Sequence, residues 1–266
     1  AEITDVTHIW SPGRALTRAE VVERHAYLSG LMPRWRHIVA LSDELALPGN
    51  EDRAMLFHDQ LKVCPEAWPI IPGCAKYYDA VLQSAAVSWK RHWLAADIDR
   101  LAMITYAHDR QDPELASYLE HLKTTCPKAV FAAQGGEMLD QDTVSGYLNQ
   151  SRVGLILSAA EGGCRGVAEY QFSGLPVVTT IHRGGRMAFV NPSHMQIVPA
   201  EEKSIAAAVH DFILAQVDPY DIRDAFLKKH TAARQQVEKE LGVQLNWPKT
   251  APAFLNLFTL EAPHAA

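Results

Sequence analysis

From about Ala75 onward, short apolar segments alternate with longer amphipathic ones, and this alternation constrains the fold more than any other feature of the chain. Six strands are predicted, at residues 78–84, 101–107, 128–133, 153–158, 176–180 and 195–199. Helices are predicted between or after them, at 90–98, 112–125 (following the second strand), 140–150 with Asp140 as N-cap, and in the segment after Pro199. Such a pattern predicts an α/β fold, a doubly wound parallel sheet covered on both faces. A sheet of this kind binds ligands at the carboxyl ends of its strands.

The chain divides into three predicted parts. Residues 1–74 form a short or truncated N-terminal region, with a helix at 17–30, strands at 37–42 and 53–57, and a proline-rich linker at 64–73. Residues 75–216 form the Rossmann-like domain, and residues 217–266 form a C-terminal helical segment whose helical run covers 221–241. The first part is too short to hold a second Rossmann domain.

Composition excludes several classes of protein. The 266 residues are 48% hydrophobic and 21% charged, as in ordinary globular proteins, and the net charge of -6 disfavours nucleic acid or an anionic membrane as the main partner. The four cysteines have no CxxC spacing, so neither a zinc site nor a disulfide framework is indicated, and we expect reduced thiols in a cytoplasmic protein. No apolar run reaches the ~20 residues of a transmembrane helix.

Between Val153 and Val178 the chain reads VGLILSAAEGGCRGVAEYQFSGLPVV, a buried strand, a glycine-rich turn, a short helix and a second buried strand. Glu161 and Glu169 lie at i and i+8, a little over two helical turns apart, so both can face one side near the start of the helix. Two carboxylates placed this way can hold a polyhydroxylated ligand, while backbone amides of the turn hold an anion. The alternative for each glutamate is a solvated position on a helix face.

This segment resembles the donor-binding C-terminal domain of GT-B glycosyltransferases, in particular glycosyltransferase family 4 (group 1). The signature of that family is Glu, seven residues, Glu, followed by a small-Gly-Leu-Pro strand, here Ser173 to Val178. The resemblance implies that Glu161 acts in catalysis by accepting hydrogen bonds from the donor sugar, and that Glu169 binds the ribose. It also implies donor contacts from Gly162, Gly163 and Cys164, although the usual Phe-Gly is replaced by Gly163-Cys164.

The family also implies a basic pair after the first strand of this domain. Lys90 matches its lysine, and the expected Gly-Arg is missing. Either Arg91 compensates for the missing arginine, or the diphosphate is held less tightly. Arg165 is a third cation near the expected phosphates. The alternative for all three is an exposed basic residue near a helix start.

Two turns have open interpretations. Gln134 and Gly135 lie where the family packs the nucleotide base, and a plain turn is an equal alternative. The segment His182 to Arg186 resembles the family's Gly-Gly turn and carries two arginines that could bind an anion, against a solvated loop. No histidine is assigned a catalytic role.

The function expected from this resemblance is transfer of a sugar from a UDP- or GDP-sugar to an unknown acceptor, with retention and without a metal or other cofactor. The first alternative is a non-catalytic or partner-dependent nucleotide-sugar-binding subunit, because the acceptor side cannot be located in residues 1–74. A weaker alternative is an epimerase of the same architecture. The expected partners are the nucleotide sugar and the acceptor, with an oligomer or partner subunit left open.

Overall fold

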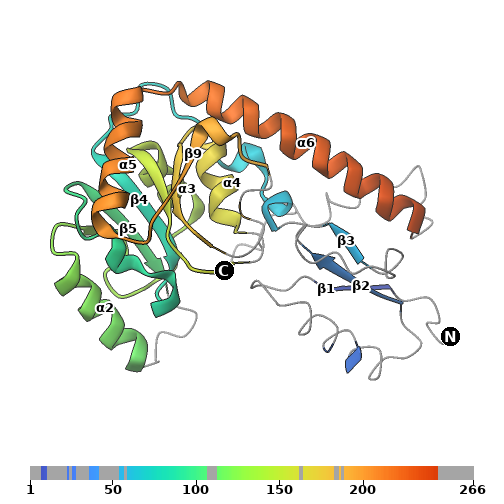
Figure 1. The fold of residues 1–266 in the computed structure, drawn as a ribbon, viewed down its shortest axis with the longest axis horizontal. Coiled ribbons are helices and arrows are strands. Elements are labelled where there is room, and N and C mark those ends of the chain that lie inside the picture. Colours follow the sequence, from blue (N-terminus) through green and yellow to red (C-terminus); the bar gives the residue numbers. More distant parts are fainter. Residues whose placement is uncertain are drawn as a thin grey trace.

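The computed structural model describes residues 7–10, 23, 26–27, 36–41, 54–56, 59–106, 113–161, 164–182, 186 and 189–244. Its centre is a six-stranded sheet in the order β6-β5-β4-β7-β8-β9, in which every neighbouring pair is parallel (Figure 1). The strands are β4 (Tyr78–Ala85), β5 (Leu101–Tyr106), β6 (Val130–Phe131), β7 (Ser151–Ile156), β8 (Val177–Thr180) and β9 (Met195–Val198). The order reverses direction between β4 and β7, which confirms the doubly wound sheet predicted from the sequence.

A second, three-stranded parallel sheet is formed by the N-terminal part of the chain. It consists of β1 (Thr7–Trp10), β2 (Arg36–Leu41) and β3 (Ala54–Leu56), in that order. The strands predicted at 37–42 and 53–57 correspond to β2 and β3, whereas β1 was not predicted. The helix predicted at 17–30 lies mostly outside the described residues.

Five helices of the described part connect and cover the strands: α2 (Pro113–Thr125), α3 (Gln141–Asn149), α4 (Arg165–Phe172), α5 (Glu202–Ala215) and α6 (Pro219–Gln244). Asp140 is the N-cap of α3, as predicted, and its carboxylate accepts a hydrogen bond of 2.7 Å from the backbone amide of Thr143. None of the described helices combines the length and the apolar character that crossing a bilayer requires.

Successive side chains of the central strands point to opposite faces, so the sheet has two cores. On one face Val81 and Ile156 pack with residues of α3, α4 and α6. On the other face Leu82 and Leu155 pack with residues of α2 and α5. Burial of both faces explains why the strands read as continuous apolar runs in the sequence.

The helix predicted at 90–98 is wrong. The structure has two short 3₁₀ helices there, η4 (Ser88–Lys90) and η5 (His92–Ala95), separated by Arg91 in the left-handed conformation with φ of 54°. A left-handed residue cannot continue a right-handed helix, so the turn breaks at this point. The third strand is also shorter than predicted, since β6 covers only Val130–Phe131.

Helix α4 lies close to the sheet because β7 has a glycine where the two meet. A Cβ atom at Gly154 would lie 2.3 Å from the ring of Tyr170, which no real contact allows. The fully buried Tyr170 then reaches β4, where its hydroxyl accepts a 2.8 Å hydrogen bond from the amide of Gln83. This contact links the helix that carries Glu169 to the strand that ends at Ala85.

The segment before β4 packs against the central sheet and α6. It contains η2 (Asp59–Lys62) and η3 (Pro65–Ala67), and its residues Leu61, Val63 and Trp68 belong to the same buried cluster as Val81. In Figure 1 the long α6 passes from the central sheet over this segment. The division of the chain at residues 74 and 216 stays a prediction.

Candidate ligand-binding site

A cavity of about 400 Å³ opens at the carboxyl ends of β4, β5 and β7, where the topology predicts a ligand site. Its volume is within the range of small-molecule pockets. The strand ends contribute Gln83, Ser84, Tyr106 and Ser158 to its wall. The remaining polar and charged lining residues are Lys90, Gln141, Glu161, Arg165 and Glu169, and Cys164 lies among them.

Both glutamates of the sequence motif line this one cavity. Glu161 is 6% exposed and Glu169 is 7% exposed, so neither is a solvated helix residue. Glu161 precedes α4, and Glu169 lies within it. The spacing of i and i+8 therefore brings two carboxylates to one side, as predicted.

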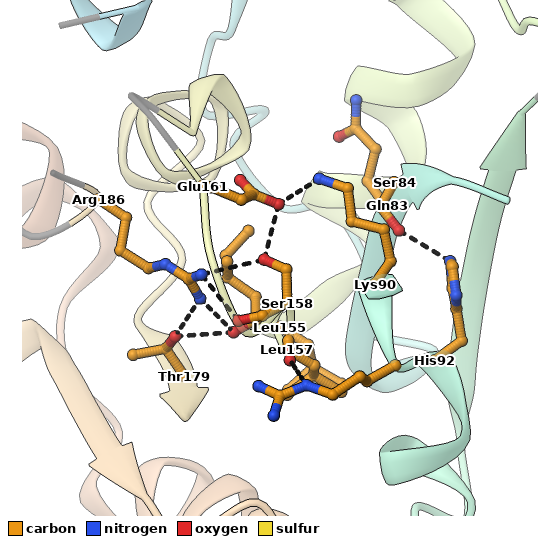
Figure 2. A network of polar contacts seen from close by, with 12 residues as sticks. Gln83, Ser84, Lys90, His92, Leu155, Leu157, Ser158, Glu161, Thr179 and Arg186 are labelled. Carbon is orange, nitrogen blue, oxygen red and sulfur yellow. Dashed lines mark hydrogen bonds and ion pairs between the residues drawn. The ribbon is translucent and has the colours of Figure 1, made fainter. Parts of the chain in front are cut away.

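Glu161 is held by a cation and a hydroxyl (Figure 2). Its Oε1 forms an ion pair with Nζ of Lys90 and accepts a 2.7 Å hydrogen bond from the hydroxyl of Ser158. Burial acts to raise the pKa of this carboxyl, but the charge of Lys90 and hydrogen bonds from Cys164, Lys90 and Ser158 outweigh it, so the pKa lies below its usual range. Glu161 is therefore an ionised hydrogen-bond acceptor and not a general acid.

Arg186 supports this arrangement from the far side of Ser158. It is fully buried, its Nη2 donates to both Oγ (3.0 Å) and the carbonyl of Ser158 (2.8 Å), and its Nη1 donates to Oγ1 of Thr179 (2.9 Å) and the carbonyl of Ile156 (3.1 Å). Figure 2 shows these contacts to the left of and below Glu161. Arg186 is thus an internal brace between β7 and β8, which corrects the expectation that it binds an anion from a loop; Arg183 lies outside the described residues.

Glu169 has a different environment. Burial raises its pKa above the usual range, and the opposing effects of the Arg165 charge and a hydrogen bond from the Gln83 side chain are smaller. Its carboxylate consequently gains from any ligand hydroxyl that restores the lost hydration.

The predicted basic pair is split by the structure. Lys90 lines the cavity, whereas Arg91 turns away from it, with Nε donating to the carbonyl of Leu157 (2.6 Å) and Nη2 to Oγ1 of Thr180 (2.5 Å). Burial, followed by the like charge of Arg186, lowers the pKa of Arg91. These contacts tie the ends of β7 and β8 to η5, so the side chain of Arg91 is engaged with protein and is not aimed at the cavity.

The other predicted residues fall into three groups. Cys164 and Arg165 line the cavity at the start of α4, with Cys164 as its N-cap. Gly162 and Gly163 lie outside the described residues. Gln134 and Gly135 do not line the cavity; the Gln134 amide donates to the carbonyl of Phe131, and the Gly135 amide donates to Glu137.

Several lining residues have no individual role in the prediction from the sequence, namely Trp68, Gln83, Ser84, Tyr106, Met138 and Ser158. For Ser84, Tyr106 and Ser158 a signal was present, because each lies at or just after the carboxyl end of a predicted strand. Trp68 gave no signal, since it comes from the segment predicted to be a linker. In the described part of the chain no group of three or more His, Cys, Asp or Glu side chains is placed to hold a metal ion.

The fold is a Rossmann-like α/β fold, and three solved structures with which it superposes are GT-B glycosyltransferases. HepE from Anabaena in complex with UDP-glucose superposes with a TM-score of 0.65 at 14% identity, covering 88% of this chain and 72% of that one. TarM superposes with a TM-score of 0.62 at 12% identity, covering 90% of this chain and 50% of TarM. AviGT4, a glycosyltransferase involved in avilamycin A biosynthesis, superposes with a TM-score of 0.51 at 17% identity, covering 70% of this chain and 57% of AviGT4.

The chain thus spans between one half and about three quarters of the length of these structures. No protein-family model and no curated protein sequence matches it.

Proposed function

We propose that this chain is the donor-binding part of a glycosyltransferase resembling family 4, which transfers a sugar from a UDP- or GDP-sugar with retention and without a metal. The observation that carries the proposal is that Glu161 and Glu169 open into one cavity at the carboxyl edge of a parallel sheet. Glu161 accepts hydrogen bonds from the sugar, and Glu169 accepts them from the ribose. Retention is inferred from the resemblance alone.

The charge requirement of the reaction supports the same assignment. A nucleoside diphosphate leaves with growing negative charge, which cationic side chains and helix N-termini stabilise. Lys90 and Arg165 line the cavity beside the first turn of α4, and their charges lie near the two carboxylates. If these groups neutralise the leaving diphosphate, EDTA leaves the rate of transfer unchanged.

The experiment that tests this proposal compares Glu161→Ala with Glu238→Ala, a matched change on α6 away from the cavity. Transfer, or hydrolysis of the donor when no acceptor is known, is measured with a panel of UDP- and GDP-sugars. We expect Glu161→Ala to lower the rate at least about 100-fold, because a carboxylate that contacts the reacting sugar is lost. Circular dichroism and melting temperature verify that the variant is folded. Full activity in folded Glu161→Ala contradicts the proposal.

Thermal shifts identify the base. A ligand that binds only the folded state raises the melting temperature, so UDP, GDP and their sugars are compared at equal concentrations. The nucleotide that raises the melting temperature most contains the base of the donor. Absence of a shift with every nucleotide, at concentrations up to several millimolar, contradicts the proposal.

A second candidate is a nucleotide-sugar-binding subunit that needs a partner for the acceptor side. This candidate is considered because no acceptor-side motif, such as a Gly-Gly loop, is found in the sequence of residues 1–74. The two candidates differ in one measurement on the purified chain. Nucleotide binding without transfer or donor hydrolysis supports the subunit, and turnover by the chain alone supports the enzyme.

A further inference from the structure

Three side chains form a hydrogen-bonded series that ends at the cavity wall. Ser84, at the carboxyl end of β4, lines the cavity, and its Oγ lies 2.8 Å from Nε2 of His92. Nδ1 of the same imidazole lies 3.0 Å from the hydroxyl of Tyr118 on α2. His92 is fully buried at the start of η5. Figure 2 shows Ser84 beside Lys90, with His92 at the right of the view and joined to Ser84 by a dashed line.

The imidazole of His92 is neutral at physiological pH. Burial, followed by the like charge of Lys90, lowers its pKa to about 3. Burial likewise raises the pKa of Tyr118 to about 12, so the phenol keeps its proton. A neutral imidazole donates from one ring nitrogen and accepts at the other. The hydrogen bonds of the series can therefore be oriented in only two ways.

The two directions present different groups to the cavity. When Nδ1 donates to Tyr118, Nε2 accepts the Ser84 proton, and the serine offers only oxygen lone pairs to a ligand. When Tyr118 donates to Nδ1, Nε2–H donates to the oxygen of Ser84, and the serine proton is free to point into the cavity. An anionic ligand binds the second form, because a phosphate oxygen needs a donor.

We propose that Ser84 is a phosphate ligand for the nucleotide-sugar donor, donating its hydroxyl proton to a phosphate oxygen while buried His92, in its Nε2–H form, and Tyr118 hold it in that orientation. This inference rests on the proposed function, because it is the diphosphate of the donor that supplies the anion. Ser84 contacts the ligand, and His92 and Tyr118 are positioning residues.

The same geometry argues against Ser84 as a nucleophile. Activation of a serine requires a base that takes up its proton, as histidine does when a carboxylate stabilises the imidazolium. The charge acting on His92 is instead the positive charge of Lys90, which opposes protonation. The series therefore orients a donor and does not generate an alkoxide.

The test compares Ser84→Ala with Ser88→Ala, an exposed serine of η4 that does not line the cavity. Calorimetry measures the affinity for UDP or GDP, whichever stabilises the unaltered chain more. A competition experiment measures the affinity for the nucleoside with the same base. We expect Ser84→Ala to weaken binding of the diphosphate about tenfold or more, because a hydrogen bond to a charged group is lost, and to leave the affinity for the nucleoside unchanged. Ser88→Ala should change neither.

Tyr118→Phe tests the direction of the series. It removes the donor to Nδ1 and is compared with Tyr147→Phe on α3. We expect Tyr118→Phe to weaken the diphosphate about two- to fivefold, because the imidazole is no longer held in one tautomer. Nitrogen-15 NMR of the unaltered chain with diphosphate should find His92 protonated at Nε2 and unprotonated at Nδ1.

Three results would overturn the inference. If His92 is protonated at Nδ1 in the complex, the hydrogen bonds run in the direction opposite to the one proposed. Unchanged diphosphate affinity in Ser84→Ala, or an equal loss for nucleoside and diphosphate, removes the phosphate contact while the proposed function stands. Failure of the unaltered chain to bind any nucleoside diphosphate removes the proposed function and this inference together.

Discussion

Glu161 and Glu169 carry the same functional group and are nearly equally buried, yet their environments shift the pKa values of the two carboxyls in opposite directions. An ion pair with Lys90 and a hydrogen bond from Ser158 keep Glu161 ionised in the absence of a ligand. Glu169 lies deep in α4 with weaker compensation, and its pKa is raised. One carboxylate is thus satisfied by the protein, and the other is satisfied best when a ligand arrives.

Replacing Glu169 should separate stability from binding. Because the pKa of Glu169 is raised in the folded state, the unfolded chain ionises first as pH rises, and ionisation of this group favours unfolding above the usual glutamate pKa of about 4.3. We expect Glu169→Gln to raise the urea midpoint at pH 8, to leave it unchanged near pH 4, and to weaken nucleotide binding at least about tenfold.

Urea unfolding of Glu169→Gln at several pH values measures this effect, with Glu238→Gln as the matched control. Its midpoint relative to the unaltered chain should increase with pH, and the control should follow the unaltered chain. A constant difference across the pH range would show that ionisation of Glu169 has no part in stability.

Arg186 is a further test at the scale of one residue. Its guanidinium donates to two strands in a planar fork, which a lysine ammonium cannot reproduce. We expect Arg186→Lys to cost about 2–4 kcal/mol of unfolding free energy and to lower activity, because Ser158 loses its support and Glu161 its orientation. The matched control is Arg152→Lys, an exposed position on β7. A melting temperature equal to that of the control would contradict the role of Arg186 as a brace.

At the scale of elements, α6 holds the segment before β4 in place. Arg223 donates to the carbonyls of Trp68 (2.6 Å), Pro65 (2.8 Å) and Phe172, and Arg234 donates to the carbonyl of Leu61 (3.1 Å). Since Trp68 lines the cavity, a helix outside the cavity determines part of its wall. Carbonyl groups of the loop and of two short helical turns thus accept hydrogen bonds from arginine side chains, and the Pro65 carbonyl accepts a second one from the amide of Trp68.

Removal of this tether should loosen the segment without unfolding the sheet. We expect Arg223→Met to speed amide exchange of residues 61–68 by about tenfold or more and to lower the melting temperature by several degrees, because three carbonyls each lose the hydrogen bond from Arg223. Lys228→Met, an exposed change on the same helix, is the control. Hydrogen exchange followed by mass spectrometry measures both. Unchanged exchange in Arg223→Met would mean that packing of Trp68 alone holds the segment.

At the scale of the whole molecule, the sequence predicts the central sheet well because strands buried on both faces are nearly continuous apolar runs. The Glu161 and Glu169 pair was predictable for a similar reason, since a strand, a turn and a helix fix where both side chains point. The break at Arg91 was not, because its left-handed turn is accompanied by contacts with Leu157 and Thr180, far away in the sequence. The burial of Arg186 depends equally on strands that meet only in the folded chain.

The histidines make a prediction for the molecule as a whole. His92 and His230 are buried, and desolvation lowers their pKa values from 6.5 to about 3 and about 4. As pH falls below 6.5 the unfolded chain takes up protons that the folded chain does not, so stability is lost progressively down to the folded values. Between pH 7 and pH 5 each histidine should remove about 2 kcal/mol from the unfolding free energy.

His230 is the cleaner test, because it lies on α6, where Nε2 is 3.2 Å from the carbonyl of Gln60 and does not contact the cavity. In His230→Gln the group that titrates is gone while a donor to that carbonyl remains. Between pH 7 and pH 5 the unfolding free energy of the variant should therefore fall by about 2 kcal/mol less than that of the unaltered chain. Urea unfolding at the two pH values measures this difference, and His210→Gln, an exposed change on α5, should behave like the unaltered chain. An identical loss in His230→Gln would show that the acid sensitivity arises elsewhere, with His92 as the next group to test.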